Sequence, residues 1–448
     1  MKHSAPRGAS PTGWERLAAA LFRGLEEGRR SKTRPHWGGA TARDWPKPPQ
    51  TQKTSSKKHS VIGLRKLCYC CLPNDIMKQL PVLEPGDKPR KETWYTLTLV
   101  GDSPCARVGH SCSYLPPVGD AERGKVFIVG GADPNRSFSD VHTIDLGTHQ
   151  WELATSEGLL PRYEHTSFTP SCTPHSIWVF GGADQSGNRN CLQVLNPDTR
   201  TWTTPEVTGP PPSPRTFHTS SAAIGDQLYV FGGGERGAQP VQDVQLHVFD
   251  ANTLTWSQPK TQGKPPSPRH GHVMVAAGTK LFIHGGLAGD NFYDDLHCID
   301  ISDMKWQKLR PTGAAPTGCA AHSAVAVGKH LYVFGGMTPT GALNTMYQYH
   351  IERQHWTLLK FDNSPPAGRL DHSMCIIPWP GTCTSEKEDS NSATVNCDAE
   401  KGDSTEKGVT QGGDSHEESQ ADTLLCFVFG GMNTEGEIYD DCIVTAVD

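Results

Sequence analysis

Short apolar runs, each ending at a pair of glycines, recur along most of the chain. Six of them read VFIVGG, IWVFGG, LYVFGG, LFIHGG, LYVFGG and FVFGG. Runs this short, bounded by turn-forming residues, are typical of buried β-strands and are far below the roughly 20 apolar residues that span a bilayer. The pattern therefore predicts an all-β protein built from many short strands.

The glycine pairs recur at a nearly constant distance. Intervals of 51, 51, 53 and 50 residues separate the first five pairs, and a sixth follows after a longer gap. A period near 50 with a double glycine after a strand is typical of the kelch-type β-propeller. The pairs are Gly130 and Gly131, Gly181 and Gly182, Gly232 and Gly233, Gly285 and Gly286, Gly335 and Gly336, and Gly430 and Gly431.

Two further signals repeat with the glycines. A tryptophan follows each of the first five pairs, at Trp151, Trp202, Trp256, Trp306 and Trp356. An Arg-x-x-His motif precedes the apolar run at Arg107/His110, Arg162/His165, Arg215/His218, Arg269/His272 and Arg369/His372. The fifth repeat keeps His322 but carries Cys319 in place of the arginine. We expect the glycines to permit close approach of neighbouring blades and the tryptophans to fill the wedges between them.

The two ends of the repeat region predict how the ring closes. After the last glycine pair the chain ends without a tryptophan, whereas a spare tryptophan, Trp94, precedes the first Arg-x-x-His motif. We therefore predict a six-bladed propeller over residues 93–448, in which the strand around Trp94 completes the last blade. Closure of this kind leaves no open sheet edge.

Two segments differ from the repeats in charge. Residues 1–76 carry 15 Lys and Arg against 5 Asp and Glu, and we expect residues 1–92 to form a disordered basic extension. Attraction to anionic lipid or nucleic acid, with palmitoylation of Cys68, Cys70 and Cys71, is one interpretation. A dispensable tail is the interpretation that we favour, because Met77 would itself begin a chain with all six blades.

An acidic insertion interrupts the last repeat. Residues 381–423 carry 11 acidic and 3 basic side chains with many serines, which predicts a disordered loop within the last blade. Ser415 stands before His416, Glu417 and Glu418 and resembles a site for an acidophilic kinase. A solvated spacer is an equally good interpretation of this loop.

Strand direction places candidate binding residues on one face. Because the strands of a blade alternate in direction, the loops after the glycine pairs open on the face opposite the acidic insertion. Three of these loops carry an arginine, whereas others carry Asp290, Glu435 and Glu437. The half-basic rim, with aromatic anchors, suits a protein partner, although solvated arginines without a shared role would give the same pattern. The candidate rim residues are Arg136, Phe138, Arg189, Arg236, Phe292 and Tyr293.

The sequence contains no recognisable catalytic or cofactor motif. The six motif histidines occupy equivalent positions around the ring, so we attribute them to blade packing and not to a metal site. The glycine pairs end strands and lack the phosphate-loop pattern. The 14 cysteines are scattered without framework spacing, as expected for reduced thiols in the cytosol. We therefore expect no enzymatic activity, no cofactor and no bound metal.

From Met77 onward the chain resembles the kelch-motif family of Rab effectors. The resemblance rests on the segments MKQLPVLEPGDKPRKETWYTLTL, RVGHSCSYLPPVGD, GNRNCLQVLNP and FGGMNTEGEIYDDCIV. It covers about 372 residues, includes the acidic insertion and leaves residues 1–76 outside. It implies binding to a GTP-bound Rab GTPase of the late endosome and a role in returning mannose-phosphate receptors to the trans-Golgi network.

The functional prediction is a non-enzymatic interaction propeller that promotes vesicle transport or docking as an effector of this Rab. We expect a monomer in the cytoplasm, held peripherally on endosomal and trans-Golgi membranes through its partners, without nucleic acid. A kelch substrate receptor or scaffold for another assembly, such as a ubiquitin ligase, is the alternative. A kelch-type metal oxidase or lyase fits least well.

Overall fold

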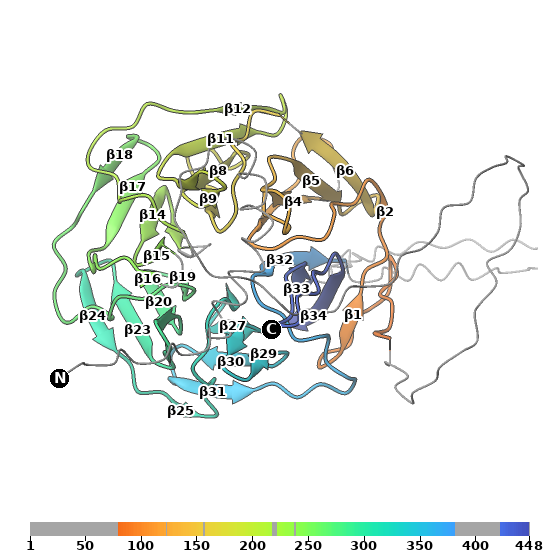
Figure 1. The fold of residues 1–448 in the computed structure, drawn as a ribbon. Coiled ribbons are helices and arrows are strands. Elements are labelled where there is room, and N and C mark those ends of the chain that lie inside the picture. The colour runs from red at the N-terminus through yellow and green to blue at the C-terminus, as the bar shows by residue number, and fades with distance from the viewer. Residues whose placement is uncertain are drawn as a thin grey trace, which may run out of the picture.

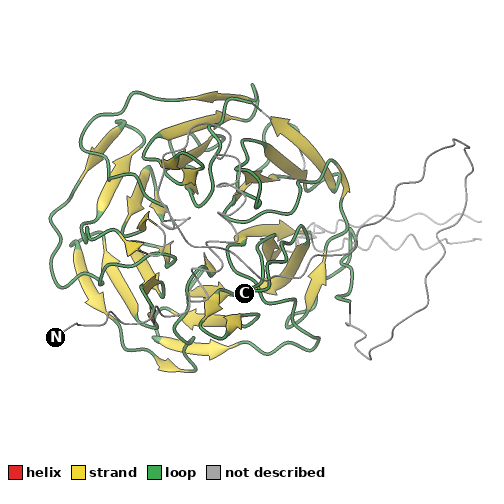
Figure 2. Ribbon diagram, in the orientation of Figure 1, coloured by secondary structure: helices red, strands yellow, loops and turns green. Residues whose placement is uncertain are grey.

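The computed structural model describes residues 79–121, 123–155, 157–216, 222–236, 239–380 and 422–447. In this part of the chain six sheets stand side by side around a central axis, and no residue is helical (Figure 1, Figure 2). The prediction of an all-β, six-bladed propeller is confirmed. Within each blade the strand that follows the Arg-x-x-His position lies nearest the axis, and the meander continues outward from it.

Each blade is a meander of four strands with antiparallel neighbours, and blades 1 and 5 gain a short parallel strand at the outer edge. Blade 1 contains β2 (Val100–Gly101), β3 (Ser111–Leu115), β4 (Lys125–Val129), β5 (Val141–Asp145) and β6 (Gln150–Thr155). Blade 2 contains β7 (Thr166–Phe168), β8 (Ile177–Phe180), β11 (Leu192–Asn196) and β12 (Thr201–Thr203). Blade 3 contains β13 (Ala223–Ile224), β14 (Gln227–Val230), β17 (His247–Asp250) and β18 (Thr255–Ser257).

The remaining three blades follow the same order. Blade 4 contains β19 (Val273–Ala277), β20 (Lys280–His284), β23 (Leu296–Asp300) and β24 (Lys305–Lys308). Blade 5 contains β25 (Thr312–Gly313), β26 (Ser323–Val327), β27 (His330–Phe334), β30 (Met346–His350) and β31 (His355–Leu358). Blade 6 contains β1 (Trp94–Thr96), β32 (Ser373–Trp379), β33 (Thr423–Phe429) and β34 (Cys442–Val447). Four blades also carry a small hairpin after the glycine pair: β9 (Ala183–Asp184) with β10 (Gly187–Asn188), β15 (Gly234–Arg236) with β16 (Gln239–Pro240), β21 (Leu287–Ala288) with β22 (Asn291–Phe292), and β28 (Met337–Thr338) with β29 (Gly341–Ala342).

The two ends of the propeller meet in blade 6, as predicted. Strand β1 pairs antiparallel with β34, with Trp94 opposite Thr445, and so becomes the outer strand of the last blade. Asn363 fixes this strand from blade 5, because its side chain accepts from the backbone nitrogen of Trp94 (3.0 Å) and donates to its carbonyl (2.7 Å). The ring is therefore closed by hydrogen bonds as well as by packing.

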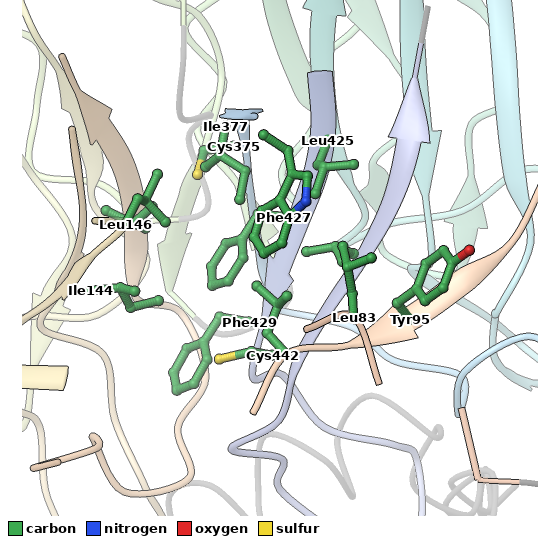
Figure 3. Close-up of a cluster of buried hydrophobic side chains, with 14 of the residues drawn as sticks. Leu83, Tyr95, Ile144, Leu146, Cys375, Ile377, Leu425, Phe427, Phe429 and Cys442 are labelled. Atoms are coloured by element: carbon green, nitrogen blue, oxygen red, sulfur yellow. The ribbon is translucent and has the colours of Figure 1, made fainter. Parts of the chain in front are cut away.

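The predicted boundary of the N-terminal extension, at residue 92, is too late. Residues 79–92 lie against blade 6, and Leu83 is buried in a cluster with Tyr95, Ile377 and Phe427 (Figure 3). The indole nitrogen of Trp379 also donates to the carbonyl of Asp87 (2.9 Å). The apolar residues of this segment form a short run, Leu80 to Leu83, that Pro81 interrupts, which argues against a strand. Leu83 nevertheless fills the seam between blades 6 and 1.

The glycine pairs join neighbouring blades, as expected. The second glycine of each pair donates its backbone N–H to a carbonyl oxygen of the next blade. The acceptor is the residue at the arginine position of the Arg-x-x-His motif, and the distance is 2.8–3.1 Å at all six junctions. Both glycines have positive φ, and a Cβ on Gly130 would lie 2.7 Å from the carbonyl oxygen of Arg162. Any side chain here would therefore both strain the backbone and push the blades apart.

The tryptophans fill the outer wedges between blades. Trp94 is fully buried, and its ring lies 4.9 Å from that of Phe334 in blade 5. Trp151, Trp256, Trp306 and Trp356 are buried in the same way. Trp202 departs from the prediction, since it is only half-buried at the edge of the cluster between blades 1 and 2.

Several sequence-based expectations lie outside the described residues. These are the fate of residues 1–78, most of the acidic insertion (residues 381–421), His218 and the candidate phosphorylation site Ser415. Among the residues that the structure describes, no helix is long and apolar enough to cross a membrane.

Candidate functional site: the loop rim and the central cavity

The loops after the glycine pairs and the connections between blades open at the same end of the propeller. The innermost strand of each blade starts at this end and the next strand returns to it. The Arg-x-x-His motif and the glycine pair therefore lie together. The acidic insertion connects β32 to β33 and therefore starts from the opposite end. The predicted arrangement of faces follows directly from this topology.

Arg136 is the exposed cation of the first rim loop. Its guanidinium lies over the ring of Phe138, with 4.9 Å between the guanidinium carbon and the ring centroid. The guanidinium carbon of Arg107 lies 4.3 Å from the same ring centroid. Phe138 is only 3% exposed, so the expectation that it is an apolar anchor on the surface is wrong. The ring instead supports Arg136 by a cation–π contact.

The other two predicted arginines have different surroundings. Arg189 is half-buried and forms an ion pair with Asp184 in its own hairpin. Its charge is thereby largely neutralised for a partner. Arg236 ends β15 opposite Gln239, and its side chain lies outside the described part of the structure.

The two aromatic residues of the fourth loop are half-buried. Phe292 packs against an apolar cluster that includes Val108, Met337 and Met432, from three different blades. The guanidinium carbon of Arg269 lies 4.2 Å from the ring centroid of Tyr293. Both rings are therefore partly used by the fold, and the rim offers a mixed surface of one free-standing arginine and partly covered aromatic rings.

Buried arginines fix the inner ends of the blades beneath this rim. Arg269 is fully buried and donates to the carbonyl of Gly285 (2.9 Å) and to the carboxylate of Asp295 (2.6 and 3.3 Å). Arg107 with Asp140 and Arg369 with Asp441 form the same pair. The arginine and histidine neighbours hold the pKa of Asp140 and Asp295 well below the usual range. A buried guanidinium with this set of acceptors is a structural joint and not a free binding group.

Two blades depart from this pairing in an informative way. In blade 2 Cys191 occupies the carboxylate position, and Arg162 donates instead to the side-chain oxygen of Gln193 (2.6 Å). In blade 5 both members are replaced, the arginine by Cys319 and the carboxylate by Thr345. Thr345 occupies the position of Asp295 because its carbonyl accepts from the backbone nitrogen of Gly335, as the carbonyl of Asp295 accepts from Gly285. In blade 5 the charge pair is thus replaced as a unit, whereas in blade 2 the buried Arg162 keeps its charge and donates to uncharged acceptors.

The motif histidines meet around a central cavity. Its lining includes His110, His165, His272, His322 and His372, together with two acidic residues. The rings are packed by the repeat, as expected: those of His110 and His372 lie edge-on to Phe429 and Phe334 of the preceding blade. Burial lowers the pKa of His110 to about 3, so the imidazole is neutral.

The two acidic residues of the cavity are Glu164 and Asp371. Both have a left-handed backbone, and each has a buried carboxylate oxygen without a hydrogen-bond partner among the described residues. Burial raises the pKa of Asp371 to about 7 and, aided by the charge of Asp371, raises that of Glu164 well above its usual value. Backbone hydrogen bonds join Glu164 to Gly109 (2.6 Å) and Gly109 to Asp371 (2.9 Å) around the axis.

One cluster of potential ligands was missed by the sequence reasoning. His284, Cys319 and His322 come together at the junction of blades 4 and 5, all three buried. The signals were present, because Cys319 breaks the arginine motif and LFIHGG carries a histidine where other runs have an apolar residue. What the sequence did not show is that the two irregular residues face one another.

Comparison with known proteins agrees with the repeat assignment. A family model described as the KLHDC2/KLHL20/DRC7 Kelch-repeats domain matches residues 88–234, 118–336 and 220–382. Proteins named "Rab9 effector protein with kelch motifs" are 98% identical in Bos taurus and 85% identical in Homo sapiens, over 372 residues that cover 83% of this chain and the whole relative. The relative of the same name in Danio rerio is 55% identical, again over its whole length.

Proposed function

The chain belongs to the kelch-repeat family that contains the Rab9 effector proteins with kelch motifs, and on this premise we propose that it binds a GTP-bound Rab GTPase. The observation that carries the proposal is the identity of 98% over the full length of a relative with that name. We propose further that the complex forms on late endosomes and promotes vesicle transport to the trans-Golgi network. The protein would act there without catalysing a reaction, as a monomer held on the membrane by its partners.

The loop rim is the surface that best supports this function. Arg136 is exposed, is held over Phe138 and belongs to a loop anchored by Asp133, whose carboxylate accepts from the backbone nitrogen of Arg136 (2.9 Å). A cation whose position is fixed before binding loses less conformational entropy in a complex than a free lysine or arginine would. Arg136 is therefore the rim residue that we expect to contribute most to binding, with Arg189, Arg236, Phe292 and Tyr293 around it.

Nucleotide discrimination is the property that makes a binding protein an effector. A partner that bound the GTP and GDP states equally would shift no equilibrium and transmit no signal. We therefore expect the full chain to bind Rab9 loaded with a GTP analogue at least about tenfold more tightly than Rab9 loaded with GDP. Calorimetry or surface plasmon resonance on the purified proteins would measure both affinities, and equal or absent binding would reject the effector proposal.

A pair of charge reversals would locate the surface. We expect Arg136→Glu to weaken binding of GTP-loaded Rab9 by at least about fivefold, because a well-placed interface arginine contributes more than about 1 kcal/mol. Arg353→Glu is the matched control, since Arg353 is exposed in the turn between β30 and β31 at the opposite end. Weakening by the control alone would move the interface to the other face. Co-purification of ubiquitin-ligase subunits instead of a Rab would favour the substrate-receptor alternative.

A further inference from the structure

The junction between blades 4 and 5 differs from the other junctions in two residues that lie side by side. The residue before the first glycine is His284, where the other blades have Val129, Phe180, Phe231, Phe334 or Phe429. Across the junction, Cys319 stands where every other repeat has a buried arginine. The repeat histidine His322 completes the group. Two independent departures from the repeat thus fall at one place and both introduce a side chain that can bind a metal.

We propose that His284, Cys319 and His322 form a binding site for a soft divalent cation of the zinc type. Each side chain contributes one nitrogen or sulfur, and the three ligand atoms lie within 4.8 Å of one another. Imidazole with thiolate is a donor set that zinc prefers in proteins, and calcium or magnesium would require oxygen ligands. Among the motif histidines that the structure describes, no other belongs to such a group.

The spacing of the two histidines fits a metal between them. The Nδ1 atom of His284 lies 3.2 Å from the Nε2 atom of His322. Two nitrogens bound to one tetrahedral zinc ion, each at about 2.0–2.1 Å, are separated by about 3.3 Å. The separation of the two nitrogens therefore matches that of two ligands on one tetrahedral ion, and the sulfur of Cys319 lies within the same group.

Metal binding requires the two imidazoles to free their inner nitrogens and the Cys319 thiol to lose its proton. Their outer nitrogens, Nε2 of His284 and Nδ1 of His322, are buried without a hydrogen-bond partner in the described chain. The proton shared between the inner nitrogens can therefore move to an outer nitrogen. Binding also converts the Cys319 thiol to a thiolate, so one proton is released for each ion bound.

One ligand of the site, His322, lines the central cavity, and so do Glu164 and Asp371. With two neutral ligands and one thiolate, a divalent ion leaves one net positive charge. The fourth coordination position is left for a water molecule or an outside ligand, as in open zinc sites. This proposal departs from the expectation of no bound metal, which was argued from the repeated histidines; the site uses only one of them, His322.

Cobalt(II) is the probe that reports this site directly. Full-length, tag-free protein, stripped with a chelator, is titrated with Co²⁺ and then with Zn²⁺. We expect one equivalent of Co²⁺ to produce thiolate-to-cobalt charge-transfer absorption and the intense visible bands of a tetrahedral ion. One equivalent of Zn²⁺ should abolish both, and about one proton should be released per ion. A wild-type protein that shows no charge-transfer band at stoichiometric metal overturns the proposal.

Matched variants assign the ligands. Cys319→Ala should remove the charge-transfer band. Cys298 is also buried but lies in blade 4, and Cys298→Ala should retain the band. His284→Phe restores the residue of most other repeats and should weaken Co²⁺ binding at least about tenfold. If His284→Phe fails to fold, His284→Gln serves the same purpose, and thermal melting of the wild type with and without one equivalent of Zn²⁺ is independent of any variant. A band that survives in Cys319→Ala, or an unchanged melting temperature, would also contradict the site.

Discussion

The junction of blades 3 and 4 and the junction of blades 4 and 5 have the same backbone and different chemistry. At the first, Phe231 packs against His272 and Arg269 binds Asp295. At the second, His284 takes the place of the phenylalanine and Cys319 that of the arginine. The second glycine nevertheless donates to the next blade over 2.9 and 2.8 Å respectively. The glycine pair therefore carries the join, and the side chains around it are free to diverge.

The largest effect is expected when the Arg269–Asp295 pair at the junction of blades 3 and 4 is broken. Arg269→Met removes the guanidinium from the carboxylate of Asp295, 14% exposed, which keeps only His297 (2.9 Å) and the exposed Lys308 (3.6 Å). We expect the free energy of unfolding to fall by about 3–5 kcal/mol, because removing one member of a buried pair leaves an uncompensated charge. Urea denaturation measures it. Lys308→Met, which removes the exposed cation from the same carboxylate (3.6 Å), is the control and should cost less than about 1 kcal/mol.

Asp371 provides a test at the centre of the ring, where blades 4 and 5 carry Gly271 and Ala321 instead. Its pKa is about 7 in the fold and about 3.9 in an unfolded chain. Between these values the folded protein holds a proton that the unfolded chain has released, so stability falls as pH rises from about 4 to 7.

We therefore expect Asp371→Asn to stabilise the protein at pH 8 by up to about 4 kcal/mol and to leave stability at pH 4 almost unchanged. The carboxylates of Asp140 and Asp295 act in the opposite sense, since their lowered pKa values stabilise the fold above about pH 4 and lose that effect in acid. Denaturation curves from pH 4 to 8 test the prediction, and parallel curves for the variant and the wild type would contradict it.

Converting the junction of blades 4 and 5 to the arginine–carboxylate type of the other blades should be possible only with two substitutions. Cys319→Arg alone places a guanidinium opposite Thr345 and should cost about 3 kcal/mol of unfolding free energy. Adding Thr345→Asp should recover part of the loss, with a coupling energy of about 0.5–3 kcal/mol. A double-mutant cycle in urea measures the coupling. Strict additivity would mean that the two positions do not pair in this blade.

The smallest effect is expected for truncation at the same place. Cys319→Ala in metal-free protein removes one buried sulfur and no charge, and we expect a loss of only about 1 kcal/mol. Urea denaturation of this variant and of Arg269→Met under the same conditions compares the loss of unfolding free energy at the two junctions. A loss as large as that of Arg269→Met would show that the thiol has a structural role beyond packing.

The parts of the fold that were predictable are those that repeat. The glycine pairs, the tryptophans and the spare Trp94 were enough for the blade count and for closure through β1 and β34. The predicted boundary at residue 92 was wrong because Leu80, Val82 and Leu83 make up a run of only four residues with Pro81, too short to show a period. The prediction that Phe138 is a surface anchor was wrong for a related reason. Its ring is buried in contact with two arginines from different parts of blade 1.

The sequence by itself determined the architecture, because a blade is a local unit whose strands and turns are specified within about 50 residues. Only the tertiary structure decided which side chains meet between blades. His284 of blade 4 meets Cys319 and His322 of blade 5 only because consecutive blades pack face to face. Contacts of this kind depend on the packing of one repeat against the next, so no pattern within a single repeat reports them.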